Sequence, residues 1–191
     1  KADLDNVLFV EGDASNLAGV ADSSFDLLVT VFGAMFAPRP YDVASEMVRV
    51  TRRGGRIVMA NWIPGDPTLV AQILKVSAAY TPPPPEGFVS PMTWGDEAEV
   101  RRRFEAAGIA PDRIGFERAT WFFRYDGAPV ELLDTFRRFY GPAMNAFEAA
   151  ARNGREKQLA DELEVLFTAQ NRGAETTIIP ATYLKVTVNK D

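Results

Sequence analysis

The 191-residue sequence contains no cysteine and no histidine. The absence of cysteine excludes disulfides, thiolate nucleophiles and thiolate metal ligands. The absence of histidine removes the usual general base and the commonest metal ligand. Serine–histidine and cysteine–histidine catalysis are therefore both excluded. Any chemistry must rely on a reactive ligand or on Asp, Glu, Tyr, Lys and Arg side chains, and we predict no metal site.

The sequence also lacks long apolar runs and a strong excess of one charge. No stretch reaches the roughly 20 apolar residues that a membrane span needs, and the first residues contain no signal-peptide core. Acidic residues number 26 and basic residues 21, giving a formal charge of -5, and no run of like charge is long enough to follow a phosphate backbone. We therefore predict a cytoplasmic protein with neither a membrane nor a nucleic acid as partner.

The composition fits a globular domain. Hydrophobic residues make up 47% of the chain, which is enough to bury the core of one domain with a smaller subdomain attached. No internal repeat, charged tail or linker divides the chain into independent domains. The helices expected late in the chain are therefore best interpreted as an insertion into a single fold.

A strand, a helix and a second strand are predicted in the first third of the chain. The apolar run FDLLVTVF, residues 25–32, is typical of a central strand covered on both faces in a parallel sheet. Apolar residues then recur at helical spacing over residues 43–50, and Gly54-Gly55 ends the helix. RIVMANW, residues 56–62, is the next strand, so we expect a right-handed parallel crossover. An earlier apolar run, residues 8–10, leads into Glu-Gly-Asp and predicts another buried strand.

The remaining residues predict more helices and a final strand. Four consecutive prolines in TPPPPEGFVSP predict an extended polyproline segment, the best candidate for a loop or lid. The other expected elements are helices over 67–80, 96–107 and most of 129–172, and strands over 113–126 and 181–189.

Several of these segments, in this order, carry a family resemblance. NVLFVEGDASNL (6–17), SSFDLLVTVFGAMF (23–36), RRGGRIVMANW (52–62) and SPMTWGDEAEVRRRF (90–104) together resemble the later half of a class I S-adenosylmethionine-dependent methyltransferase. The resemblance implies an α/β fold with a doubly wound, mostly parallel Rossmann-like methyltransferase sheet and an inserted helical cap. It also implies that S-adenosylmethionine binds across the carboxyl ends of the strands.

This resemblance implies a domain organisation and a gap. Residues 1–128 and 174–191 would form a partial Rossmann-like methyltransferase core, and residues 129–173 a helical cap insertion. The family's glycine-rich turn and its acidic ribose-binding residue would precede the first residues, and the 191 residues hold no G-x-G motif. The chain is then either part of a longer protein or a shortened form. In the family's strand order two strands separate residues 8–12 from residues 25–32, about 14 Å, so we expect these two strands not to be neighbours.

Three cofactor contacts are implied by the resemblance. Asp13 matches the acidic residue that accepts a hydrogen bond from the adenine amine, and the backbone of Ala14 matches the amide that meets a ring nitrogen. Phe32 matches the position that borders the methionine part of the cofactor. A carboxylate suits the first role because it only accepts hydrogen bonds, whereas the amine donates them. From the residues alone, an Asx turn or a helix cap is the alternative for Asp13.

Acceptor contacts are predicted at the carboxyl edge of the sheet, in the segment after residue 80 and in the cap. The candidates are Met35, Phe36, Trp62, Trp94 and Tyr140, with Tyr80 and Asn145 also considered. Ordinary core packing is the alternative for the aromatic residues and for the methionine, since such side chains at helical spacing are common in cores.

Two functions from different classes fit these patterns. The first is S-adenosylmethionine-dependent methyl transfer to a small-molecule acceptor by direct displacement. That reaction needs in-line approach and a desolvated pocket more than a general base, so no catalytic residue is assigned. The second is a non-catalytic module that keeps the fold for small-molecule binding or association, which the missing glycine turn favours. Whether the chain forms a homodimer stays open.

Overall fold

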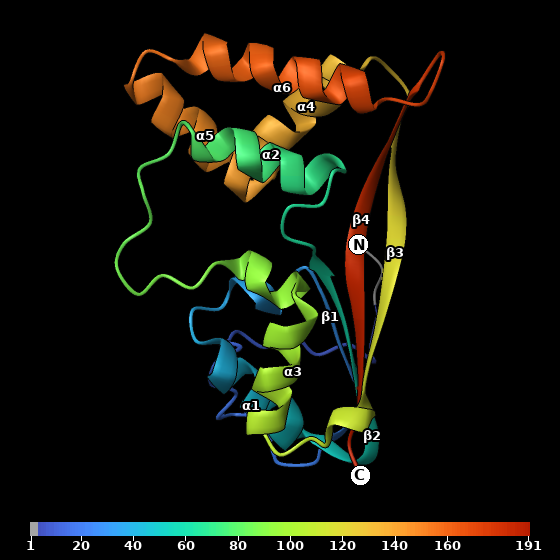
Figure 1. Cartoon of the computed structure of the whole chain (residues 1–191). Helices are drawn as coiled ribbons and strands as arrows, with labels where there is room; N and C mark the ends of the chain where they lie inside the picture. The colour runs from blue at the N-terminus through green and yellow to red at the C-terminus, as the bar shows by residue number, and fades with distance from the viewer. Residues whose placement is uncertain (1–3) are drawn as a thin grey trace.

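The computed structural model describes residues 4–191, which build one sheet and two groups of helices (Figure 1). The strands are β1 (Phe25–Val31), β2 (Thr51–Trp62), β3 (Ile114–Tyr125) and β4 (Thr177–Asn189). Their order in the sheet is β1-β2-β4-β3, with β1 parallel to β2 and β4 antiparallel to both of its neighbours. Three strands therefore point the same way and β4 is reversed between them, so the described sheet is mixed, with one parallel and two antiparallel pairings.

Helices α1 (Pro40–Val50) and α3 (Glu97–Ala106) cover one face of the sheet (Figure 1). Val43 and Met47 of α1 and Phe104 of α3 pack with Ile57 of β2 and Val186 of β4 in one buried cluster. The opposite face is more open, because alternate residues of β1 on that side are exposed. The residues that the structure describes thus hold one of the two helical layers expected for a doubly wound sheet.

The remaining helices form a second body beyond one end of the sheet (Figure 1). They are α2 (Leu69–Ala78), α4 (Pro129–Phe139), α5 (Gly141–Arg152) and α6 (Glu156–Gln170). Leu69, Leu133, Phe147 and Leu163, one from each helix, belong to a second buried cluster, which Ile179 of β4 joins. The predicted cap of residues 129–173 contains three of these helices. The fourth, α2, comes from the part of the chain assigned to the core.

Short 3₁₀ turns and helix caps follow local sequence rules. The turns are η1 (Ala34–Phe36), η2 (Pro91–Gly95) and η3 (Pro111–Arg113). Asp96 caps α3, and its carboxylate accepts hydrogen bonds from the backbone N–H groups of Ala98 at 2.9 Å and Glu99 at 3.0 Å. Tyr140 separates α4 from α5, and Pro142 lies in the first turn of α5, where its missing N–H costs nothing. None of the helices in residues 4–191 is long and apolar enough to cross a membrane.

The first apolar run departs from the prediction. Leu8, Phe9 and Val10 form no strand and are 86%, 92% and 70% exposed. A strand needs neighbours to pair its backbone groups, and none of residues 4–191 pairs with this segment. The predicted buried strand is therefore wrong for this structure. Residues 8–10 are not hydrogen-bonded to β1, whose partner in the described sheet is β2. The expected separation by two strands stays a prediction, because residues 8–10 form no strand.

Strand β1 itself is found where the sequence predicts it, but it is not covered on both faces. Within the described residues it pairs on one side only, with β2, and it forms an edge of the sheet. Leu27, Val29 and Val31 are 44%, 55% and 61% exposed on the open face. The continuous apolar run correctly indicates that both faces of β1 are apolar. It does not predict how many helices or strands cover those faces.

Candidate functional site

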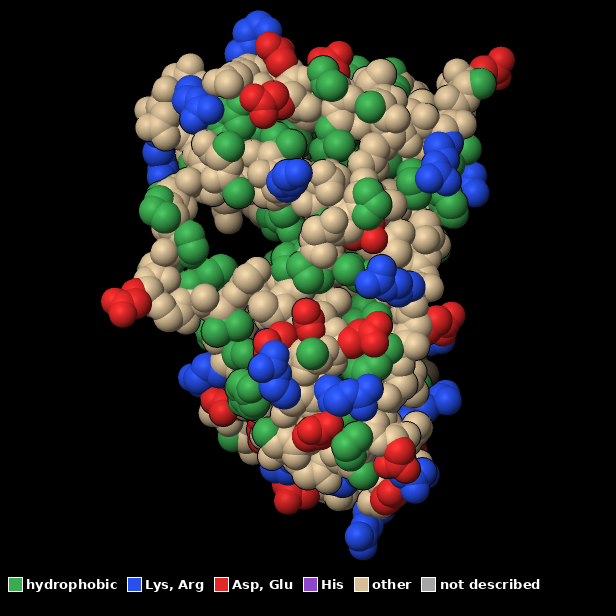
Figure 2. Space-filling model, viewed as in Figure 1, with side chains coloured by type: hydrophobic (Ala, Val, Ile, Leu, Met, Phe, Trp, Pro, Cys, Tyr) green, Lys and Arg blue, Asp and Glu red, His purple; other side chains and the backbone are tan. Residues whose placement is uncertain are grey.

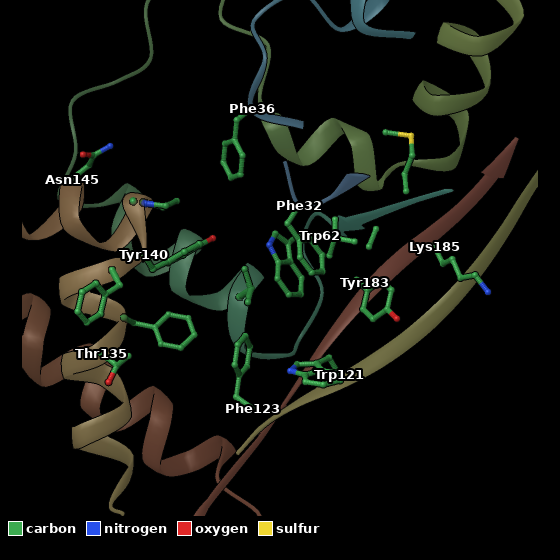
Figure 3. A pocket seen from close by; sticks show the side chains of 18 of the residues that line it. Phe32, Phe36, Trp62, Trp121, Phe123, Thr135, Tyr140, Asn145, Tyr183 and Lys185 are labelled. Atoms are coloured by element: carbon green, nitrogen blue, oxygen red, sulfur yellow. The ribbon is translucent and has the colours of Figure 1, made fainter. Parts of the chain in front are cut away.

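A pocket of about 1030 Å³ lies at the carboxyl ends of β1 and β2, between the open face of the sheet and helices α4 and α5 (Figure 3). Figure 2 shows a hollow at the boundary between the upper helical body and the lower part of the molecule. The sheet contributes side chains that share its open face because they stand opposite one another in register, as Trp62 does with Tyr183. The lining residues are Val31, Phe32, Phe36, Val58, Met59, Ala60, Trp62, Val70, Trp121, Phe123, Thr135, Phe136, Phe139, Tyr140, Gly141, Pro142, Asn145, Tyr183 and Lys185.

The sheet wall of the pocket is built around Phe32. Its ring stacks on Trp62 with centroids 3.7 Å apart and planes 3° apart, and it meets Tyr183 edge-on at 5.7 Å. The backbone of Phe32 is left-handed, with φ 52, a conformation that costs a non-glycine residue on the order of 1–3 kcal/mol. Its N–H donates a hydrogen bond to the carbonyl of Ala60 at 2.9 Å, which helps to hold the turn. A strained residue that is fixed in a pocket in this way is typical of a functional site.

The helical wall is formed by aromatic residues that pack edge to face. Phe136 of α4 meets Phe123 of β3 at 5.2 Å and Tyr140 at 5.5 Å. The Tyr140 hydroxyl is buried and has no hydrogen-bond partner among the residues that the structure describes. Burial raises the pKa of Tyr140 to about 12, because the charged phenolate would lose its hydration there. This side of the pocket is therefore mainly aromatic, with a tyrosine that stays protonated at neutral pH.

The rim of the pocket carries exposed aromatic side chains. Phe36 of η1, Trp121 of β3 and Phe139 of α4 are 50%, 60% and 73% exposed. Lys185 of β4 also reaches the pocket, but its ammonium lies 2.9 Å from the carboxylate of Glu117 on β3. In Figure 3 its amine points away from the aromatic side chains, so it offers the pocket its methylene stem.

The residues predicted to meet adenine lie near the same edge of the sheet. Ala14 lines a smaller cavity of about 280 Å³ together with Thr30 and Gly33, which are at the end of β1 and just beyond Phe32. Asp13 is exposed, and one oxygen of its carboxylate accepts a hydrogen bond from the backbone N–H of Ser15 at 2.8 Å. This is the Asx-turn geometry weighed as the alternative for Asp13.

The surroundings of Asp13 stabilise the ionised form of its carboxylate. The hydrogen bond from the Ser15 backbone lowers the pKa of Asp13 from its usual value, and the nearby guanidinium of Arg39 adds to the effect. The second carboxylate oxygen lies 3.8 Å from that guanidinium. The turn uses one oxygen of an ionised carboxylate, so the other can still accept a hydrogen bond from a ligand.

The structure separates the predicted acceptor contacts into two groups. Phe36, Trp62, Tyr140 and Asn145 line the large pocket, as does Phe32, which was predicted to border the cofactor. The other three lie in buried cores, where the packing alternative places them, and line neither cavity described above: Met35, Tyr80 and Trp94.

Specific contacts account for two of these buried residues. Trp94 lies beneath the guanidinium of Arg103, 4.5 Å from its ring centroid, and Tyr80 donates a hydrogen bond to Glu162 at 2.7 Å. Sequence reasoning missed the pocket residues contributed by β3 and β4. Alternation along those strands predicts which residues share a face, but only the register shows that Trp121 and Tyr183 share the face that bears Trp62.

Comparison with known sequences finds a family match in the first part of the chain. Residues 1–59 match the family model described as a methyltransferase domain. An uncharacterized protein of Mycobacterium tuberculosis is 35% identical over 130 residues, which cover 66% of this chain and 44% of that protein. The demethylmenaquinone methyltransferase of Paenarthrobacter aurescens is 44% identical over 54 residues, 28% of this chain and 21% of that protein. The chain spans about half the length of the first of these relatives.

Solved structures share the fold. The YcgJ protein of Bacillus subtilis matches with a TM-score of 0.53 and 17% identity, over 97% of this chain and 72% of that one. A protein of Bacillus halodurans described as a candidate methyltransferase matches with a TM-score of 0.52 and 13% identity, over 94% of this chain and 70% of that one. The predicted resemblance to class I S-adenosylmethionine-dependent methyltransferases is confirmed by the family match at the start of the chain and by the Rossmann-like fold.

Proposed function

We propose that this protein transfers a methyl group from S-adenosylmethionine to a small molecule held in the aromatic pocket. The observation that carries the proposal is the position of the pocket at the carboxyl ends of β1 and β2, where open α/β sheets bind ligands. Phe32 lines this pocket, and its neighbour Gly33 lines the smaller cavity with Ala14. The segment predicted to hold the cofactor and the pocket for the acceptor therefore meet at one turn.

The residues at that turn fit the cofactor parts assigned to them. Asp13 is ionised and keeps one carboxylate oxygen for an amine donor, as an adenine contact requires. Ala14 and Gly33 bring little side-chain bulk to their cavity, which allows a flat ring to approach the backbone. Phe32 would border the methionine part. The bound cofactor supplies a methyl group on a positively charged sulfur, which is reactive without further activation.

The protein's own contribution is to position the acceptor and exclude water. The Phe32–Trp62 stack and the edge-to-face cluster of Phe136 and Tyr140 form two rigid walls. They hold a substrate in one orientation and withhold hydration from its reacting atom, both of which favour direct displacement. With S-adenosylmethionine bound, these walls would align the acceptor with the methyl carbon for direct displacement at the sulfonium. Any proton that the acceptor loses would pass to bulk water at the open rim once the product leaves the aromatic walls.

A non-catalytic binding module is the second candidate, because the aromatic pocket would serve ligand binding without methyl transfer equally well. Isothermal titration of the full-length gene product with S-adenosylmethionine and S-adenosylhomocysteine distinguishes the two. Methyl transfer predicts dissociation constants in the micromolar range or tighter. The variant Asp13→Ala is expected to bind more weakly, because it loses a charged acceptor.

The matched control for that variant is Asp161→Ala, which removes an exposed carboxylate of α6 that pairs with Lys157. It should bind both compounds as the natural sequence does. Absence of measurable binding to the unsubstituted protein would contradict the enzyme proposal and support the binding module.

A further inference from the structure

Among residues 4–191, Lys185 is the one charged residue that lines the large pocket. Its ammonium pairs with Glu117 and points away from the aromatic walls (Figure 3). The polar side chains that remain are neutral ones such as Thr135 and Asn145 on the helical wall. An anionic or cationic ligand would thus enter without a partner for its charge and would lose hydration without compensation.

Aromatic rings make up about half of the lining, and their arrangement favours flat ligands. Phe32 and Trp62 form a parallel stack, while Phe123, Phe136 and Tyr140 present rings to one another edge-on. Contacts between aromatic rings contribute affinity beyond that of the area that they bury. An alkyl chain has no such gain, so this lining distinguishes rings from chains.

The rim extends the aromatic surface beyond the pocket. Phe36, Trp121 and Phe139 come from η1, β3 and α4, and each is at least half exposed. Large apolar side chains gathered around an opening mark a binding surface more often than chance exposure does. With a volume of about 1030 Å³, the pocket is also at the upper end of the range for small-molecule sites. A ligand of one ring would leave most of this surface uncovered.

We infer that the acceptor is a neutral molecule with several fused or linked rings, which packs between the Phe32–Trp62 wall and the α4–α5 wall and covers the aromatic rim. The identification of this ligand as the methyl acceptor rests on the proposed function. The ligand class itself can be measured by binding alone, without cofactor.

The first test compares ring number and charge in simple probes. Phenol, 2-naphthol and 1-hydroxypyrene carry one, two and four rings, and 2-naphthoate is an anion with the rings of 2-naphthol. Dissociation constants would be measured at pH 7 by calorimetry on the full-length gene product. We expect affinity to rise with each added ring, and 2-naphthoate to bind at least tenfold more weakly than 2-naphthol. Equal or tighter binding of 2-naphthoate, or no gain with ring number, overturns the inference.

The second test assigns the effect to the rim. Trp121→Ala and Phe139→Ala are each expected to weaken 1-hydroxypyrene binding roughly threefold to tenfold, the value of one aromatic contact, and to leave phenol binding unchanged. Val165→Ala is the matched control, because Val165 on α6 is 69% exposed and lies outside the pocket lining. The same loss in the control, or equal losses for phenol and 1-hydroxypyrene, overturns the inference.

Failure of this inference can be separated from failure of the proposed function. If S-adenosylhomocysteine binds while the ring probes do not, the ligand class is wrong and methyl transfer stands. If the ring probes bind as expected while S-adenosylhomocysteine does not, the ligand class stands and methyl transfer is wrong.

Discussion

At the scale of single residues, the pocket depends on a few side chains held in costly states. Phe32 adopts a left-handed backbone and Tyr140 buries a hydroxyl without a partner. Both unfavourable states occur in the walls of one pocket, and such states are concentrated at binding sites in proteins. Neither state could be predicted from the sequence pattern. A phenylalanine at the end of a strand ordinarily avoids a left-handed backbone, and a tyrosine at the end of a helix ordinarily gives its hydroxyl a partner.

Trp62→Ala should destabilise the protein more than any other change in the pocket wall. Trp62 is 6% exposed and supports the ring of Phe32, so its removal creates a cavity and leaves the strained turn without its stack. We expect a loss of about 3–5 kcal/mol in the free energy of unfolding, measured by urea denaturation. Trp121→Ala, at the exposed rim, is the control and should cost well under half as much. Similar losses for the two variants would contradict the structural role of the stack.

Tyr140→Phe tests the buried hydroxyl through its pH dependence. Burial raises the pKa of Tyr140 to about 12, above the ordinary value near 10, so the folded state holds the phenolic proton more tightly than the unfolded chain does. The free energy of unfolding is therefore at its full value below about pH 10 and falls as the pH rises towards about 12.

The variant should therefore lose less stability than the natural sequence between about pH 10 and pH 12. At pH 7 it should be as stable or slightly more stable, because the hydroxyl has no partner to lose. Urea midpoints at several pH values provide the measurement. A large destabilisation at pH 7 would show that the hydroxyl makes a hydrogen bond.

At the scale of elements, most of the helices and strands could be predicted from the sequence. The helix that begins near Pro40, the strands of residues 25–31 and 114–125 and the break at Gly141 follow from periodicity and from the conformational limits of Gly and Pro. The predicted helix end at Gly54-Gly55 is wrong, because the chain is already extended in β2 from Thr51. The segment of residues 8–10 shows the limit of this reasoning. An apolar run predicts burial only when neighbouring strands are there to pair with it.

The contact between η2 and β2 is another feature that only the structure shows. A Cβ atom on Gly95 would overlap the backbone carbonyl of Trp62, so the two segments touch at a point where only glycine fits. Gly95→Ala should force η2 and β2 apart, lower the unfolding midpoint and weaken ring-probe binding through displacement of Trp62. Gly19→Ala is the control, since no atom lies within 4 Å of the added carbon. Unchanged stability in Gly95→Ala would contradict the close approach.

At the scale of the whole molecule, the site lies where two separately packed bodies meet. The sheet with α1 and α3 forms one buried cluster, and α2 with α4–α6 forms the other. The pocket takes one wall from each. The order of segments in the sequence predicts the family fold, and the fold predicts that a ligand would bind at the carboxyl edge of the sheet. The composition of the pocket could not be predicted, because it depends on how the helical body sits over β3 and β4.

In the proposed function, the methionine end of S-adenosylmethionine would lie at the turn from Phe32 to Gly33, and its adenine end at Ala14. Amide resonances of the isotopically labelled full-length gene product, followed during titration with S-adenosylhomocysteine, test this placement most directly. We predict saturable shifts at Ala14, Phe32 and Gly33, and none at Val165 on the far helix α6. Shifts confined to other regions, or no shifts at millimolar ligand, would contradict the proposed cofactor site and with it the methyl-transfer function.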